Sequence, residues 1–138
     1  MALLLYTAAR NAAANAVVDL IDADASAGRL EIRTDARPAV NAALTGTLLA
    51  SIDFDDPAFG DAAAGVATAA GRPNEDPSAD ATGTAGYGAV VDDSGDVVFT
   101  GTVGTSGSGA DFILSTLSIV AGQPVSLESM TFTQPDGS

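Results

Sequence analysis

The side chains that could do chemistry in this chain are almost all carboxylates. The 138 residues include 18 acidic residues but no His and no Cys, and the basic residues are all arginine. Without His, Cys and Lys, the chain lacks the commonest general base, the usual thiolate and imidazole metal ligands, and the amine of Schiff-base chemistry. Ser-His-Asp and Cys-His catalysis are therefore excluded.

Two acidic turns, DFDDP and DDSGD, could bind a hard cation such as calcium through oxygen ligands. The candidate ligands are Asp53, Asp55, Asp56, Asp92, Asp93 and Asp96. Asp is common in turns because it hydrogen-bonds its own backbone there, so we expect ordinary turns with no bound metal and no cofactor. A glycosidase needs two carboxylates across a cleft, but so many acids make some pair inevitable, and no catalytic residue is predicted.

The formal net charge of −13 bears on the choice of partner. Such a surface repels nucleic acid and anionic membranes, so neither is expected to bind. No apolar stretch is long enough to span a membrane. The opening MALLLYT is too short for a signal peptide and has no basic residue before its apolar run, so we expect synthesis in a cytoplasm without export.

One helix is predicted, over TAARNAAANAVVDLIDAD from Thr7 to Asp24, with Thr7 as its cap. The face expected to pack against a sheet has apolar residues at helical spacing, namely Ala9, Ala13, Ala16, Val17 and Leu20. The opposite, polar stripe is Asn11, Asn15, Asp19 and Asp22.

After the helix, the apolar residues alternate with period 2 in several short runs separated by turns. This pattern predicts a mainly β fold, an antiparallel β-sandwich of jelly-roll or Ig-like type with the N-terminal helix packed on the outside of one sheet. One domain over 1–138 is expected, with an N-terminal arm and helix in 1–24. Residues 71–83 are expected to form a surface loop, and a one-residue slip at Ser129 indicates a β-bulge. The predicted core is Leu30, Ile32, Ile52, Phe54, Val91, Phe99, Ile119 and Phe132.

The stretch GAVVDDSGDVVFTGTVGTSGSG, residues 88–109, is predicted to be a hairpin that turns at DDSGD and continues into a flexible loop. Its Gly, Ser, Thr and Val side chains form a neutral surface that can lie against another protein without desolvating charges. The apolar start ALLLY is a second such surface, unless it forms an ordinary strand of its own sandwich. The predicted interface residues are Leu3, Leu4, Leu5, Tyr6, Val98, Thr100 and Thr102.

From about Ala9 to Phe132, the order of features resembles a family of small virion structural proteins of tailed bacteriophages and related viruses. The stretches that carry the resemblance are LEIRT, LLASIDFDDPAFG, ADATGTAGY and SIVAGQPVSLESMTFT. None is a catalytic motif, so the resemblance transfers no catalytic residue. It implies a virion component, assembled in the host cytoplasm, and leaves head or tail open.

The sequence therefore favours a non-enzymatic structural protein that decorates the outer surface of a tailed-virus capsid. Its expected partners are the major capsid protein, further copies of itself, or both, as a homo-oligomer on the particle. Two alternatives remain open at this point: a tail or fibre component, and a module on the virion that binds carbohydrate or calcium.

Overall fold

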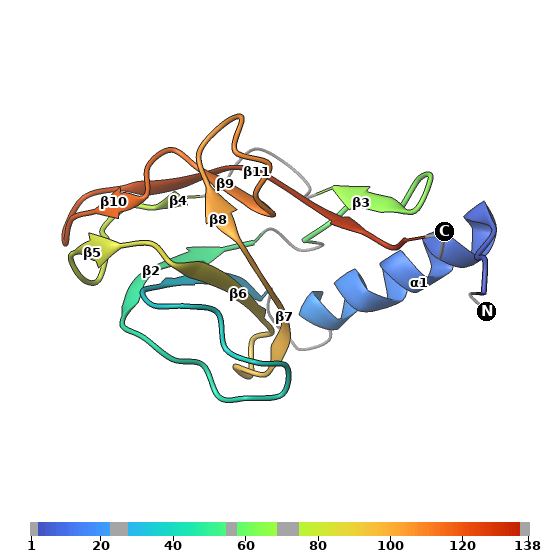
Figure 1. Cartoon of the computed structure of the whole chain (residues 1–138), viewed down its shortest axis with the longest axis horizontal. Coiled ribbons are helices and arrows are strands. Elements are labelled where there is room, and N and C mark those ends of the chain that lie inside the picture. The colour runs from blue at the N-terminus through green and yellow to red at the C-terminus, as the bar shows by residue number, and fades with distance from the viewer. Residues whose placement is uncertain (1–2, 23–27, 55–57, 69–74, 136–138) are drawn as a thin grey trace.

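The computed structural model describes residues 3–22, 28–54, 58–68 and 75–135. It is mainly β with one N-terminal helix, as the sequence predicts (Figure 1). The elements in chain order are α1 (Thr7–Asp19), the 3-10 turn η1 (Leu20–Asp22), β1 (Arg29–Arg33), β2 (Leu48–Asp53), β3 (Val66–Thr68), β4 (Glu75–Asp76), β5 (Gly83–Thr84), β6 (Tyr87–Val91), β7 (Val97–Gly101), β8 (Val103–Gly104), β9 (Phe112–Leu114), β10 (Ser118–Ile119) and β11 (Val125–Thr133). Within the described ranges, no helix is long and apolar enough to cross a membrane.

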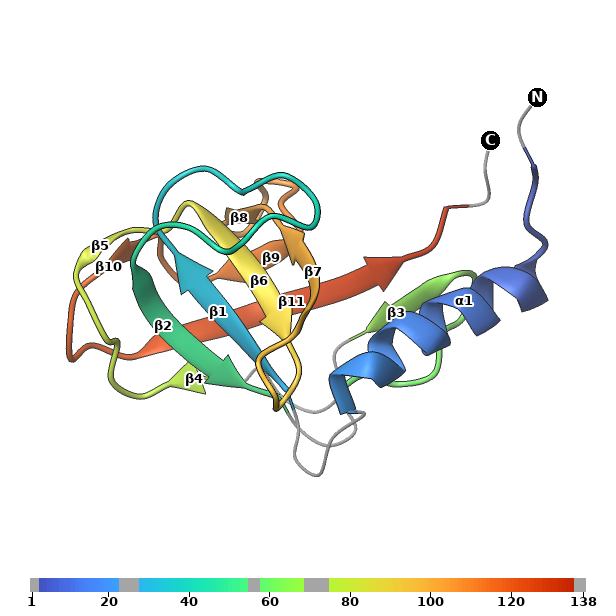
Figure 2. The ribbon, with the colours of Figure 1, turned by 90° about the horizontal axis from the view of Figure 1, so that it is seen from below.

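The strands form two larger sheets and one small one. The four-stranded sheet has the order β2-β1-β6-β7, so β7 is an edge strand. The five-stranded sheet has the order β3-β11-β9-β8, with β4 also paired to β11, and the third sheet is β10-β5. Every pair is antiparallel except β8 with β9, which is parallel and was not anticipated. The long β11 crosses behind the four-stranded sheet in the view of Figure 2, and its far end pairs with β3.

A single apolar cluster joins both larger sheets. It contains Leu30 and Ile52 from the four-stranded sheet and Phe112 and Met130 from the five-stranded sheet. Of the eight predicted core residues, six are buried, whereas Phe99 and Phe132 are only half-buried and pack at the margin of the cluster.

Strand β6 corrects one detail of the predicted core, because Val91 is buried outside the main cluster. The register pairs Leu30 with Val90, so Val90 shares the inward face. The alternation of Tyr87, Ala89 and Val91 therefore marks the other face of the sheet. Loop 34–47 covers that face, where the Tyr87 hydroxyl donates to the Thr45 carbonyl at 2.7 Å and accepts from the Thr45 N–H at 2.9 Å.

Helix α1 begins at Thr7, as predicted, but it ends at Asp19 and the η1 turn follows, whereas the helix was expected to reach Asp24. Residues 23 and 24 of the prediction lie outside the described residues. The orientation of the helix was predicted wrongly. The residues buried along α1 and η1 are Ala14, Val18 and Ile21, which alternate with the polar stripe. The expected packing face is instead exposed or half-exposed, and 55% of the Leu20 surface is accessible. Thr7 also does not cap the helix, because the N-cap position is Tyr6 and no side chain bonds there.

The polar stripe of α1 docks the helix onto the segment that leads into β3. Asn15 accepts the Ala62 N–H at 2.8 Å, and Asn11 accepts the Gly65 N–H at 2.8 Å. Asp22 accepts the Ala58 N–H at 3.0 Å. These amides require acceptors, and the Asn and Asp side chains supply them. As a result α1 lies beside β3 and the end of β11 (Figure 2).

Three smaller predictions have clear outcomes. The hairpin β6-β7 is confirmed, with Gly95 at a φ of 93° in its turn. The bulge near Ser129 is confirmed by a register shift between Leu127 and Ser129. The prediction of a surface loop at 71–83 is wrong in part, because β4 lies within it and β5 begins at its last residue. The Asp76 carboxylate of β4 accepts the Ser51 N–H at 3.0 Å. Residues 71–74 of this prediction lie outside the described residues.

Candidate functional site

The predicted metal ligands do not form a cation site in the described ranges. Asp53 ends β2 and is exposed, while Asp55 and Asp56 lie outside the described residues. In the β6-β7 turn, Asp92 Oδ1 accepts the Asp96 N–H at 2.9 Å, which is ordinary turn chemistry. Among the residues that the structure describes, no group of three or more His, Cys, Asp or Glu side chains could hold a metal ion.

We expect chelation to leave the protein unchanged. EDTA should not alter the melting temperature, and added calcium should not raise it, because the turn carboxylate of Asp92 is already bonded to its own backbone. Differential scanning calorimetry with EDTA and then with calcium measures this. A melting temperature that falls on chelation and recovers with calcium would show that a cation is part of the fold.

Both buried carboxylates of the described residues, Glu31 and Asp76, already have partners within the protein. Glu31, on β1, is 6% exposed and lies between two arginines. The Arg29 Nη2 atom is 3.0 Å from Glu31 Oε2, and Arg33 Nη2 is 2.9 Å from Oε1. Asp76 accepts backbone N–H groups of Ser51 and Ser78. Within the described ranges, no buried side-chain nitrogen or oxygen lacks a hydrogen-bond partner, so none of these buried groups is available to a substrate.

The first predicted interface, ALLLY, is exposed and outside any strand in its described part. The exposed fractions are 83% for Leu3, 63% for Leu4 and 84% for Tyr6, whereas Leu5 is half-buried. This removes the alternative that the arm is a strand of its own sheets. We call the exposed residues of this arm, Leu3, Leu4 and Tyr6, the N-terminal surface.

The second predicted interface lies along the edge strand β7. Val98 and Thr100 are half-buried, and Thr102, just beyond the strand, is exposed. The Thr102 N–H and hydroxyl both donate to Asp111 Oδ2, at 2.9 and 3.0 Å. Val97, the first residue of β7, is 45% exposed. The β6-β7 register shifts next to it, between Val90 and Val91.

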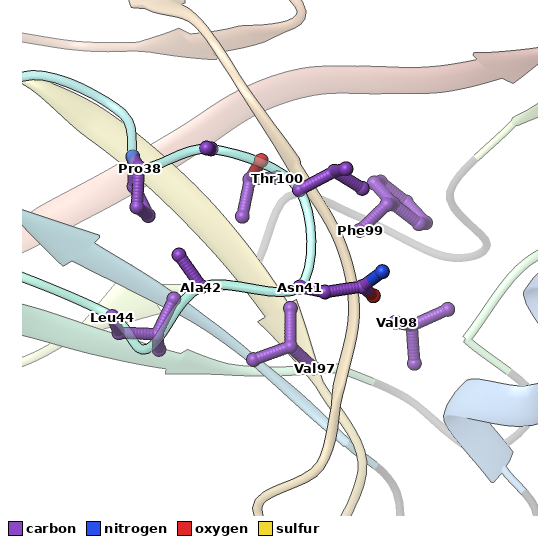
Figure 3. Close-up of a pocket in the computed structure, with 10 residues that line it drawn as sticks. Pro38, Asn41, Ala42, Leu44, Val97, Val98, Phe99 and Thr100 are labelled. Atoms are coloured by element: carbon purple, nitrogen blue, oxygen red, sulfur yellow. The ribbon is translucent and has the colours of Figure 1, made fainter.

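Sequence reasoning missed the loop that completes this surface. Residues of loop 34–47 and of β7 enclose a pocket of about 260 Å³ (Figure 3). Its lining is Pro38, Ala39, Val40, Asn41, Ala42, Leu44, Val97, Val98, Phe99 and Thr100. None of these residues is charged, and Val40 is 89% exposed. The uncharged run PAVNAAL could have been noticed in the sequence, since loops are usually more polar. We call this lining the β7 surface.

On the inner side of β7 lies a second hollow of about 500 Å³, open between β7 and the end of β11. Phe99 and Phe132 meet there with ring centroids 5.3 Å apart, and Phe99 stacks on Phe112 at 6.4 Å. Arg37 and Asp111 lie at its margin, but the Asp111 carboxylate is held by Thr102. The hollow thus lacks a free pair of catalytic groups and continues the core outward.

Taken together, the described residues present two uncharged surfaces on a strongly acidic molecule and no constellation of free reactive groups. The geometry suits binding to another protein. None of the protein-family models, curated proteins or solved structures compared with this chain matches it.

Proposed function

We propose that this chain is a non-enzymatic structural component of a virion, a decoration protein on the outer surface of a tailed-virus capsid. The observation that carries the proposal is the β7 surface, where a pocket lined only by uncharged residues adjoins exposed Val40 and Val97. An apolar surface of this kind can be buried against a larger protein without desolvating charge. The resemblance of the sequence to small virion proteins is the reason for proposing a virus particle as the partner.

The same proposal extends to the class of the fold. The four-stranded and five-stranded sheets are taken as the two layers of a β-sandwich, of jelly-roll or Ig-like type. Support comes from the cluster to which both sheets contribute, with Leu30 from one and Phe112 from the other. A two-layer β-sandwich, with loop 34–47 covering the outer face of one sheet, suits a protein that reinforces a capsid shell.

The acidic charge supports an outer position. A chain with a net charge of −13 is repelled by the phosphates of packaged DNA, so the outer wall of the head is favoured over the inner wall. Imaging of the purified particle at a resolution that traces chains tests the location. Density for this chain on the outer capsid wall is the expected result. Density on the DNA-facing wall, or only in the tail, would overturn the decoration role.

The β7 surface itself is tested by Val97→Glu. A charge placed there has to be desolvated when the surface binds, so we expect binding to particles that lack the protein to weaken about tenfold or more, equivalent to about 1.4 kcal/mol. Co-sedimentation with such particles gives the affinity. The matched control is Val120→Glu, at a valine that is 48% exposed and directly follows β10 of the separate two-stranded sheet.

Salt distinguishes the type of contact. Apolar attachment through the β7 surface should persist in about 1 M salt, where the Debye length is only about 3 Å. Release at high salt would indicate attachment through Asp side chains instead. Equal binding by both glutamate variants and the unchanged protein would show that the β7 surface is not the contact.

A further inference from the structure

The two edges of the four-stranded sheet differ in how their backbone groups are bonded. At the β2 edge, the Ser51 N–H donates to the Asp76 carboxylate at 3.0 Å, and the Leu49 carbonyl accepts the Asp80 N–H at 2.8 Å. At the β7 edge, no backbone group of β7 bonds outside the sheet to any described residue. Strand β7 also has no charged residue and no proline, the usual protection of an edge.

The hydrogen-bond pattern of the sheet shows which groups of β7 point outward. In an antiparallel sheet, successive residues direct their N–H and C=O groups alternately to one neighbouring strand and to the other. Because Ser51 points away from β1, its β1 partner Glu31 points toward β6, and Ala89 of β6 points back toward β1. Thr100 is paired with Ala89, so the Thr100 N–H and C=O point away from the sheet.

The open part of this edge is short and is centred on Thr100. Two residues further along the chain, the Thr102 N–H donates to Asp111 Oδ2 at 2.9 Å, and the Thr102 carbonyl accepts the Phe112 N–H at 2.9 Å. In the other direction, Val98 is an extra residue in the register with β6. The regular, unbonded edge therefore offers one complete donor and acceptor pair, at Thr100.

A hollow lies on each side of this edge, and Phe99 and Thr100 line both hollows. On the side of loop 34–47 is the uncharged pocket of about 260 Å³ (Figure 3). On the inner side is the hollow of about 500 Å³, where the Phe99 and Phe132 rings meet and Arg37 lies at the margin. Successive side chains of an extended peptide point to opposite faces. A strand added beside β7 would thus direct neighbouring side chains into different hollows.

Arg37 adds a charge requirement to the inner hollow. Among the described arginines, Arg10 donates to a backbone carbonyl just after β11, and Arg29 and Arg33 both pair with Glu31. Arg37 is exposed and makes no hydrogen bond or ion pair with any described residue. The cation beside the inner hollow is therefore available to a carboxylate of a bound peptide.

We propose that the edge of β7 binds an extended segment of the capsid partner as an added antiparallel strand. The residue opposite Thr100 exchanges two backbone hydrogen bonds with it and places an apolar side chain in the pocket beside loop 34–47. A neighbouring residue of the segment directs a carboxylate toward Arg37. The inference rests on the proposed function for the source of the segment and adds how that partner is recognised, by alternating apolar and acidic side chains.

A blocked peptide of about five residues tests the site without a particle. Its central leucine stands between two glutamates, with a serine at each end. Titration should shift the amide resonance of Thr100 and slow its hydrogen exchange, with a dissociation constant of about 0.1–1 mM. The same peptide with an N-methylated leucine cannot donate to the Thr100 carbonyl and should bind about tenfold more weakly. No shift at Thr100, or equal binding of both peptides, would overturn strand addition.

Thr100→Pro removes the outward N–H from the protein. Proline is tolerated at an edge where the N–H faces solvent, so circular dichroism and urea denaturation should show a folded variant. Its binding to the peptide and to particles that lack the protein should fall about tenfold or more. Val120→Pro, at an exposed residue directly after β10, is the matched control and should keep peptide binding.

Arg37→Gln tests the charge. It should weaken the glutamate peptide about two- to fivefold and leave a peptide with glutamines in those positions unchanged. An equal effect on both peptides would show that Arg37 does not pair with the carboxylate.

The particle measurements separate this inference from the proposed function. If Val97→Glu weakens particle binding and Thr100→Pro does not, the β7 surface contacts the capsid without an added strand, and the inference is wrong. If the peptide binds as expected and neither variant affects particle binding, the edge is a peptide site and the capsid contact is wrong.

Discussion

Phe112→Ala is expected to lower the free energy of unfolding by about 3–5 kcal/mol, the usual cost of removing a buried aromatic ring. Phe112 is 1% exposed and joins the two larger sheets. Its ring lies so close to β6 and β7 that a Cβ atom added at Gly88 would be 2.7 Å from it, and one at Gly101 would be 2.9 Å away. The cavity left by alanine cannot close without moving both strands. Urea denaturation followed by circular dichroism gives the value.

Two further variants make this prediction specific. Phe99→Ala should cost clearly less, because that ring is only half-buried at the margin of the cluster. Gly88→Ala should destabilise the unchanged protein by about 1–3 kcal/mol through overpacking against the Phe112 ring. In the Phe112→Ala background, the added methyl group should instead enter the vacated space. The double variant should thus be more stable than the two single costs predict. Additive costs would show that the ring and Gly88 are not in contact.

The β part of the fold could be predicted from the sequence because alternation leaves few choices where one face is buried. Leu30 and Ile32, and likewise Ala50 and Ile52, are two residues apart and share the core. The slip at Ser129 was visible because Leu127 and Met130 are both apolar but three residues apart. Where both faces of a strand are covered, alternation loses its meaning. In β6 all five residues are buried, so the sequence could not tell Val90 from Val91.

The position of loop 34–47 over the sheet was not predicted. The contacts that hold the loop there are few, and they join residues far apart in the sequence. The Tyr87 hydroxyl reaches Thr45, 42 residues away, and holds the loop over the sheet. Gly46, at a φ of 78°, lets the chain pass within contact of the Thr34 carbonyl. Neither contact leaves a periodic pattern. The β7 surface was therefore half predicted, since its strand was identified and its loop was not.

The orientation of α1 could not be predicted because the helix has two apolar faces. Ala14, Val18 and Ile21 form one, and the alanines that end at Leu20 form the other. Hydrophobicity alone favours neither. The choice is made by backbone N–H groups between 58 and 65, which require acceptors that only Asn11, Asn15 and Asp22 supply at the right spacing. The sequence of the helix alone does not indicate that these amides need hydrogen-bond acceptors.

Replacing both asparagines tests the role of the polar stripe directly. Asn11→Ala with Asn15→Ala removes the acceptors for the Gly65 and Ala62 amides. Each amide left without a partner costs about 1–3 kcal/mol, so we expect the double variant to be about 2–4 kcal/mol less stable if water reaches part of the site. The expected result is opposite to the effect on an isolated helix, since Ala favours a helix over Asn by up to about 0.7 kcal/mol per residue. A peptide of α1 should therefore become more helical while the protein becomes less stable.

Hydrogen exchange locates the loss. The amides of Ala62 and Gly65 should exchange much faster in the double variant, whereas amides in β1 and β6 should be less affected, because α1 contacts β3 and β11 rather than the four-stranded sheet. Asp19→Ala is the control, since Asp19 is a polar residue of the same helix that is exposed. If the double variant kept the stability of the unchanged chain and the same exchange at Ala62 and Gly65, the two asparagine contacts would not determine how the helix is held, and burial of Ala14, Val18 and Ile21 would be the main cause. The choice between the two apolar faces of α1 would then be unexplained. Either apolar face could pack against β3, whereas the bonds to the backbone amides can form on only one side of the helix.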